Sequence, residues 1–148
     1  MLLMLERRTN MYNNILVPID GSENSSKALD VAIEYSKLFN SKITVLSVTN
    51  ENYYGVGTLP PEAYTKIDDT AKRIVSNAEK FVSSKGIEVK GIAQKGNAKQ
   101  VIVEFANSRA DLVIIGKSGT NTLDRFIMGS TTEFVVRNAK VQVLVVNA

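Results

Sequence analysis

The sequence predicts an α/β fold in which an open sheet of five parallel strands is covered by helices on both faces. Five short apolar segments alternate with four longer segments whose apolar residues recur every three or four positions, as in repeated strand–helix–strand units. Several of the expected strands are apolar without alternation, which is typical of strands buried on both faces. Right-handed crossovers then restrict the order in which such strands can lie in the sheet.

Composition restricts the classes of function. A chain of 148 residues is long enough for one domain with its own core. Its 18 basic and 15 acidic residues give a net charge of +3 without a basic run, so nucleic-acid binding has little support. The chain has no cysteine, which fits a reducing compartment, and no histidine, the usual general base and commonest metal ligand. No apolar run approaches the roughly 20 residues of a spanning helix. We therefore expect a soluble, cytoplasmic protein without a membrane partner.

The first ten residues differ from the rest of the chain. In MLLMLERRTN a short apolar cluster precedes the arginines, which is the reverse of a signal peptide. We interpret residues 1–10 as an N-terminal extension and residues 11–148 as one domain.

The first expected strand, residues 14–19, ends in a polar turn. Pro18 has no N–H for strand pairing, so it marks the end of the strand, and Asp20 then projects from the carboxyl edge of the sheet. Ligands of open α/β sheets bind at that edge, although an aspartate there is also a common turn or helix-capping residue. An amphipathic helix over 25–39, with Leu38 in its buried apolar stripe, and a second strand over 42–48 come next in the chain.

The middle of the chain holds an irregular segment and a long helix. Residues 51–61 contain two glycines and two prolines, and residues 62–85 form an amphipathic helix with Gly86 as its expected C-cap. A strand over 87–94 and a helix beginning after Asn97 come next.

The segment from Asp111 to Thr132 carries the strongest functional signal. An apolar strand over 111–115 runs into Gly116 and Gly119, where successive backbone N–H groups can form an anion-binding nest. Gly129 then precedes a helix for which Ser130 or Thr131 is the expected N-cap, and the unpaired N–H groups of its first turn are potential phosphate ligands. Any one of these glycines alone could equally be ordinary turn punctuation.

Two better-known phosphate motifs are excluded. Gly116 and Lys117 look like the end of a P-loop, but Asp111 occupies the position of its first glycine. Gly55 and Gly57 begin a dinucleotide fingerprint, but Pro60 stands where the third glycine belongs.

The last expected strand, residues 141–146, is apolar on both faces over Val143–Val146. A final strand normally lies at a sheet edge, where its backbone can pair with another chain unless it is covered. Helices over both faces would bury these side chains and leave only the backbone edge open, and we expect a second copy of the chain to pair with that edge.

The spacing Gly-x-x-Gly, nine residues, then Gly-Ser resembles the nucleotide-binding signature of ATP-binding universal stress proteins, and the likeness covers residues 11–148. It implies a Rossmann-like, adenine nucleotide alpha hydrolase-like sheet of order 3-2-1-4-5. It also implies ATP, or ADP or AMP, with Mg²⁺ or Mn²⁺ bridging the phosphates, and a homodimer through the last strand. The implied ligands of the nucleoside are Pro18, Asp20 and the backbone of Val48. Those of the phosphates are Gly116, Gly119, Gly129, Ser130 and Thr131.

Two other functions stay open. The first is a slow ATPase or an adenylating enzyme, because Asp20-Gly21-Ser22 faintly resembles the nucleotide α-hydrolases. The glycine-rich signature of that class after the first strand is missing, and no general base stands near the expected γ-phosphate. The second is an interaction protein that binds no nucleotide, against which the intact glycines argue.

Overall fold

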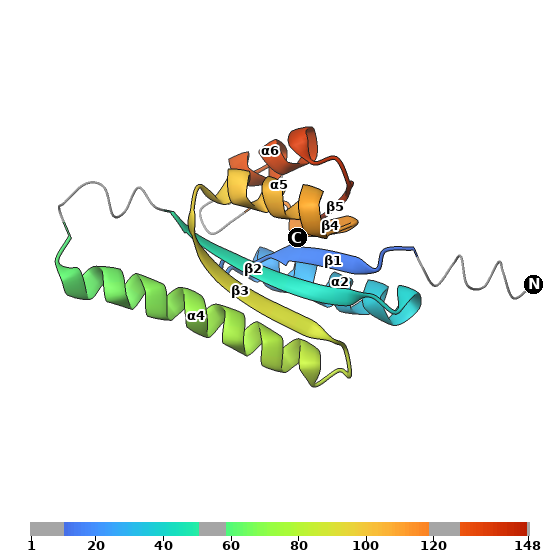
Figure 1. The fold of residues 1–148 in the computed structure, drawn as a ribbon, viewed down its shortest axis with the longest axis horizontal. Helices are drawn as coiled ribbons and strands as arrows, with labels where there is room; N and C mark the ends of the chain where they lie inside the picture. The colour runs from blue at the N-terminus through green and yellow to red at the C-terminus, as the bar shows by residue number, and fades with distance from the viewer. Residues whose placement is uncertain (1–10, 51–58, 119–127, 148) are drawn as a thin grey trace, which may run out of the picture.

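A sheet of five parallel strands in the order β3-β2-β1-β4-β5 organises the chain, so the predicted fold class and strand order are confirmed (Figure 1). The computed structural model describes residues 11–50, 59–118 and 128–147. Its elements, in chain order, are β1 (Asn14–Pro18), α2 (Glu23–Phe39), β2 (Lys42–Asn50), α4 (Pro61–Ser83), β3 (Val89–Gly96), α5 (Ala98–Arg109), β4 (Leu112–Gly116), α6 (Ser130–Asn138) and β5 (Gln142–Val146).

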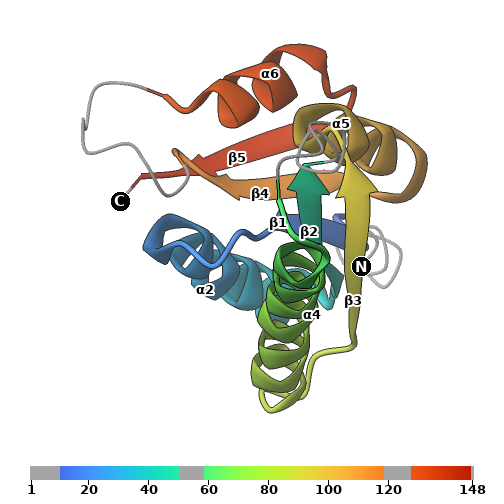
Figure 2. The same cartoon turned by 90° about the vertical axis from the view of Figure 1, so that its left-hand side faces the viewer.

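The helices form two layers. Helices α2 and α4 lie on one face of the sheet, and α5 and α6 lie on the other (Figures 1 and 2). Successive residues of a strand point to opposite faces, so Ile15 and Val17 of β1 join the core under α2 and α4, whereas Leu16 joins the core under α5 and α6. All three side chains are fully buried. Unbroken apolar strands thus follow from burial on both faces.

Strand β5 is an edge of the described sheet and pairs with β4 alone. Its apolar side chains are only half-buried, but both of its faces have helical cover. Leu144 and Val146 pack on the core shared with α2, while Val143 and Val145 pack on the core shared with α5 and α6. The expectation of helices over both faces is therefore confirmed, and the backbone edge away from β4 is the open side.

Some predicted boundaries are wrong. Helix α4 ends at the C-cap Ser84, whose N–H donates to Lys80 O and Val82 O, and not at Gly86. Two further turn bonds come after it, and Gly86 adopts φ +77 at the end of that turn, so the left-handed glycine lies at the expected position while the helix itself ends two residues earlier than predicted. Leu38, expected in the core stripe of α2, is 77% exposed. Among the residues that the structure describes, no helix combines the length and apolar character needed to cross a bilayer.

Candidate functional site

A cleft of about 300 Å³ opens at the carboxyl ends of β1, β2 and β4, beside the start of α6. The chain leaves β1 toward β2 on one side, and β4 lies on the other, so the cleft is at the switch point of the sheet. Every residue of the predicted site that the structure describes lines it: Pro18, Asp20, Val48, Gly116, Gly129, Ser130 and Thr131. Gly119 lies outside the described residues.

One wall of the cleft is apolar. It consists of the ends of β1, β2 and β4, from which Pro18, Ile19, Leu46, Val48 and Ile115 reach the surface of the cleft. Strand pairing continues one residue beyond Pro18, because the Ile19 N–H donates to Leu46 O at 2.9 Å. The apolar wall is therefore a rigid continuation of the sheet, suited to a flat, largely apolar group.

Asp20 belongs to the turn between β1 and α2. Its Oδ1 accepts a hydrogen bond from the Ser22 N–H at 2.9 Å, and Gly21 between them adopts φ +82. Ser22 is the N-cap of α2, since its hydroxyl accepts from the Ser25 N–H at 3.2 Å. Asp20 is exposed and lines the cleft. The turn role and the cleft position, treated as alternatives from the sequence, coexist in this one residue.

Gly116 is a glycine for a different reason from the one expected. It is not among the described glycines with positive φ, which are Gly21, Gly86 and Gly96. A Cβ on Gly116 would lie 2.9 Å from the backbone oxygen of Asn24 in the first turn of α2. The close approach of α2 to the end of β4 therefore excludes a side chain here.

The start of α6 is fixed to the end of β4. The Thr132 hydroxyl is buried and donates to Gly116 O at 2.8 Å, and the Gly129 N–H donates to Lys117 O at 2.9 Å. The predicted N-cap, Ser130 or Thr131, is wrong: Gly129 is the N-cap, without a side-chain cap bond, and Ser130 is the first helical residue. These two bonds to the end of β4 determine where the helix starts. A prediction from local capping preferences does not take such long-range bonds into account.

The first turn of α6 supplies hydrogen-bond donors to the cleft. The N–H groups of a first helical turn have no intrahelical partner, and the helix dipole favours an anion there. Ser130 and Thr131 line the cleft beside them. This end can therefore hold an anion such as a phosphate.

Asp20 is the only charged residue among the described residues that line the cleft, and Lys117 does not line it. Within the described ranges, no group of three or more acidic, histidine or cysteine side chains could hold a metal ion. In the described part of the site, the groups that could bind an anion are therefore backbone N–H groups and hydroxyls.

Sequence reasoning missed four hydroxyl residues of the cleft: Ser22, Ser25, Ser118 and Thr132. The Asp-Gly-Ser turn before a helix was a usable signal for Ser22. Ser118 and Thr132 had none, because their hydrogen-bond partners are 94 and 16 positions away along the chain.

Fold and cleft together define an α/β protein of the Rossmann-like class with a cleft at its switch point. The sequence model of the universal stress protein family matches residues 11–147, and this chain belongs to that family.

Individual relatives agree. A universal stress protein of Methanocaldococcus jannaschii is 31% identical over 143 residues, which are 93% of this chain and 83% of the relative. The solved structure of hypothetical protein MJ0577 superposes with a TM-score of 0.81 at 31% identity, over 92% of this chain and 96% of that one. A universal stress protein from Archaeoglobus fulgidus in complex with dAMP has a TM-score of 0.67 at 24% identity, over 91% and 98%, which shows the shared fold.

Proposed function

We propose that this protein is an ATP-binding stress-response or regulatory module. The observation that carries the proposal is the convergence of the glycine signature and the residues after β1 and in β2 on one cleft at the switch point. Residues separated by about a hundred positions in sequence meet there. Glycines that served only as turn residues would not be expected to converge on one cleft. Membership of the family and the dAMP bound by a relative of the same fold support an adenine nucleotide as the ligand class.

The two ends of the cleft give the nucleotide a direction. The apolar wall with Pro18 and Val48 suits the base, and Asp20 at its rim can accept a hydrogen bond from a ribose hydroxyl. Gly116, Gly129, Ser130 and Thr131, together with Gly119 beyond the described residues, hold the phosphates. The base thus lies over the ends of β1 and β2, and the phosphates lie at the start of α6.

A divalent cation, Mg²⁺ or Mn²⁺, fits this arrangement only as a partner of the nucleotide. Asp20 is the single carboxylate of the described cleft, and Mg²⁺ commonly combines one or two carboxylates with substrate phosphates and water. The phosphate oxygens would then supply most of the ligands that the chain lacks, and the ion would offset their charge.

We also propose that the protein forms a homodimer through β5. The strand lies at the sheet edge, and its faces are covered while its backbone edge away from β4 is open. Two such edges meeting antiparallel about a two-fold axis would pair each other's free N–H and C=O groups.

Calorimetric titration with ATP tests the proposal, with an expected dissociation constant on the micromolar scale. Gly129→Val is the informative variant. Gly129 has φ −60 and ψ 149, which any residue adopts, so the fold should survive while the new side chain obstructs the phosphate end. Val136→Ala, at a 43% exposed position of the same helix, is the control and should bind like wild type. A folded Gly129→Val protein that binds ATP as tightly as wild type would mean that the site is misplaced.

A further inference from the structure

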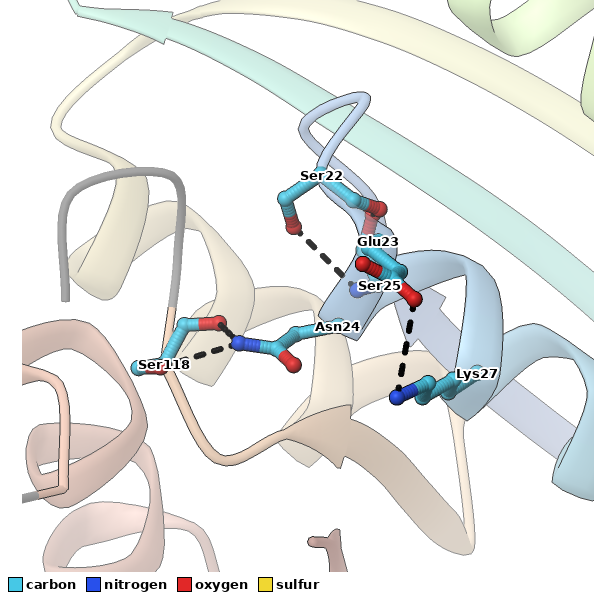
Figure 3. A network of polar contacts seen from close by, with 6 residues as sticks. All are labelled: Ser22, Glu23, Asn24, Ser25, Lys27 and Ser118. Carbon is cyan, nitrogen blue, oxygen red and sulfur yellow. Dashed lines mark hydrogen bonds and ion pairs between the residues drawn. The ribbon is translucent and has the colours of Figure 1, made fainter. Parts of the chain in front are cut away.

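The turn after β4 is held by a side chain from the opposite layer of the fold. Asn24, in the first turn of α2, donates from Nδ2 to both the backbone oxygen and the hydroxyl oxygen of Ser118, each at 3.0 Å. Figure 3 shows the Asn24 amide pointing directly at Ser118. Ser118 is 9% exposed and lines the cleft, whereas Asn24 does not line it.

These two bonds determine how the Ser118 hydroxyl can be used. A carbonyl oxygen only accepts, so the nitrogen side of the Asn24 amide must face Ser118. That nitrogen has no lone pair to offer, and the Ser118 hydroxyl therefore acts as an acceptor toward Asn24. Its own single proton remains to be donated in another direction.

The position of Ser118 places that proton at the phosphate end of the cleft. Lys117, the preceding residue, accepts from the Gly129 N–H at 2.9 Å, so the turn lies against the start of α6. The part of the apolar wall that contains Pro18 and Val48 lies at the ends of two other strands, β1 and β2. Oxygens of a phosphate accept hydrogen bonds, and a hydroxyl already fixed as a donor matches them.

We propose that Ser118 is a phosphate-binding residue of the cleft and that Asn24 is the positioning residue that fixes its hydroxyl as a donor. The proposal rests on the proposed nucleotide-binding function and adds two residues to it. Because no basic side chain is found among the described lining residues, each neutral donor contributes a larger share of phosphate affinity.

Ser118→Ala, Asn24→Ala and the double variant test the proposal, each titrated with ATP by calorimetry and with adenosine by NMR. A hydrogen bond to a charged group corresponds to roughly a tenfold change in affinity. We expect ATP to bind about tenfold more weakly to Ser118→Ala, and several-fold more weakly to Asn24→Ala. The double variant should bind ATP as Ser118→Ala does, because the two substitutions remove the same interaction and their effects do not add. Adenosine affinity should stay at the wild-type value in all three.

Glu23→Ala is the matched control. It removes the exposed ion pair between Glu23 and Lys27 (3.7 Å) beside Asn24, and both affinities should be unchanged. Thermal unfolding shows whether each variant is folded. If Asn24→Ala is not folded, the ATP affinity of Ser118→Ala, which lacks only the hydroxyl oxygen, tests the proposal alone.

Two results would overturn the proposal: ATP affinity within twofold of wild type in folded Ser118→Ala, or an equal loss of ATP and adenosine affinity, which marks a general loss of structure. Failure of wild type to bind ATP is a separate outcome and would overturn the proposed function itself.

Discussion

Replacing Gly116 with alanine adds a methyl group where α2 leaves no room for one. The new Cβ would lie 2.9 Å from the backbone oxygen and 3.0 Å from the backbone carbon of Asn24. Both atoms belong to the first turn of a 17-residue helix, so they cannot rotate away as the end of a flexible side chain could. Either α2 or the end of β4 must move.

The size of the effect can be worked out from this contact. Overpacking by one methyl group in a tightly packed region costs about 1–3 kcal/mol. For a chain of this length each kcal/mol lowers the melting temperature by about 2–4 °C, so a cost near the middle of that range lowers it by about 4–8 °C. The displaced residue, Asn24, is also the one whose side chain holds Ser118 in the cleft. We therefore expect ATP affinity to fall about tenfold, the equivalent of one lost charge-assisted hydrogen bond.

Differential scanning calorimetry measures the loss of stability, and titration with ATP measures the loss of affinity. Gly86→Ala is the control that loses stability without a change at the cleft. Gly86 has φ +77, a Cβ added to it would meet nothing within 4 Å, and it does not line the cleft. Alanine there should cost about 1 kcal/mol through backbone strain alone and leave ATP affinity unchanged. If Gly116→Ala matches wild type in both melting temperature and ATP affinity, the close-approach argument is refuted.

Three further outcomes are expected. Thr132→Val removes the buried 2.8 Å bond to Gly116 O and should destabilise the protein by about 1–3 kcal/mol in denaturant unfolding; an unchanged midpoint would show that the bond does not hold α6 in place. ATP turnover should be far slower than an enzyme's typical rate of about 10 per second, because the chain has no histidine and its described cleft only one carboxylate; phosphate release near that rate after rigorous purification would favour the enzyme alternative. Val145→Lys on β5 should weaken self-association in light scattering, whereas Ile92→Lys on the other edge strand, β3, should not; a wild-type protein that stays monomeric at high concentration contradicts the dimer.

The fold could be predicted because its causes are local and repetitive. Uninterrupted apolar strands such as Ile15–Val17 and the helical apolar stripes between them already specify a parallel sheet with two helical layers. The cleft position followed from the same reasoning, since parallel strands present their carboxyl ends at one edge. Pro18, Asp20 and Gly116 could therefore be placed at that edge before any geometry was known.

The internal bonding of the cleft could not be predicted, because its partners are far apart in sequence. The reason for a glycine at 116 is the backbone of Asn24, and the bond that orients Ser118 spans 94 positions. The predicted N-cap of α6, Ser130 or Thr131, was wrong for a related reason. A preference for serine or threonine is local, whereas the start of this helix is set by the bonds from Thr132 and Gly129 to the end of β4.

The most direct test of the central claim is a map of backbone amide chemical shifts during titration of the wild-type protein with ATP and Mg²⁺. If the cleft holds the nucleotide as proposed, the amides of Gly116, Gly129 and Ser130 shift most with ATP, while that of Val48 shifts with adenosine as well. Saturable binding whose shifts cluster elsewhere, for example between α2 and α4, would contradict the account, as would the absence of any saturable shift.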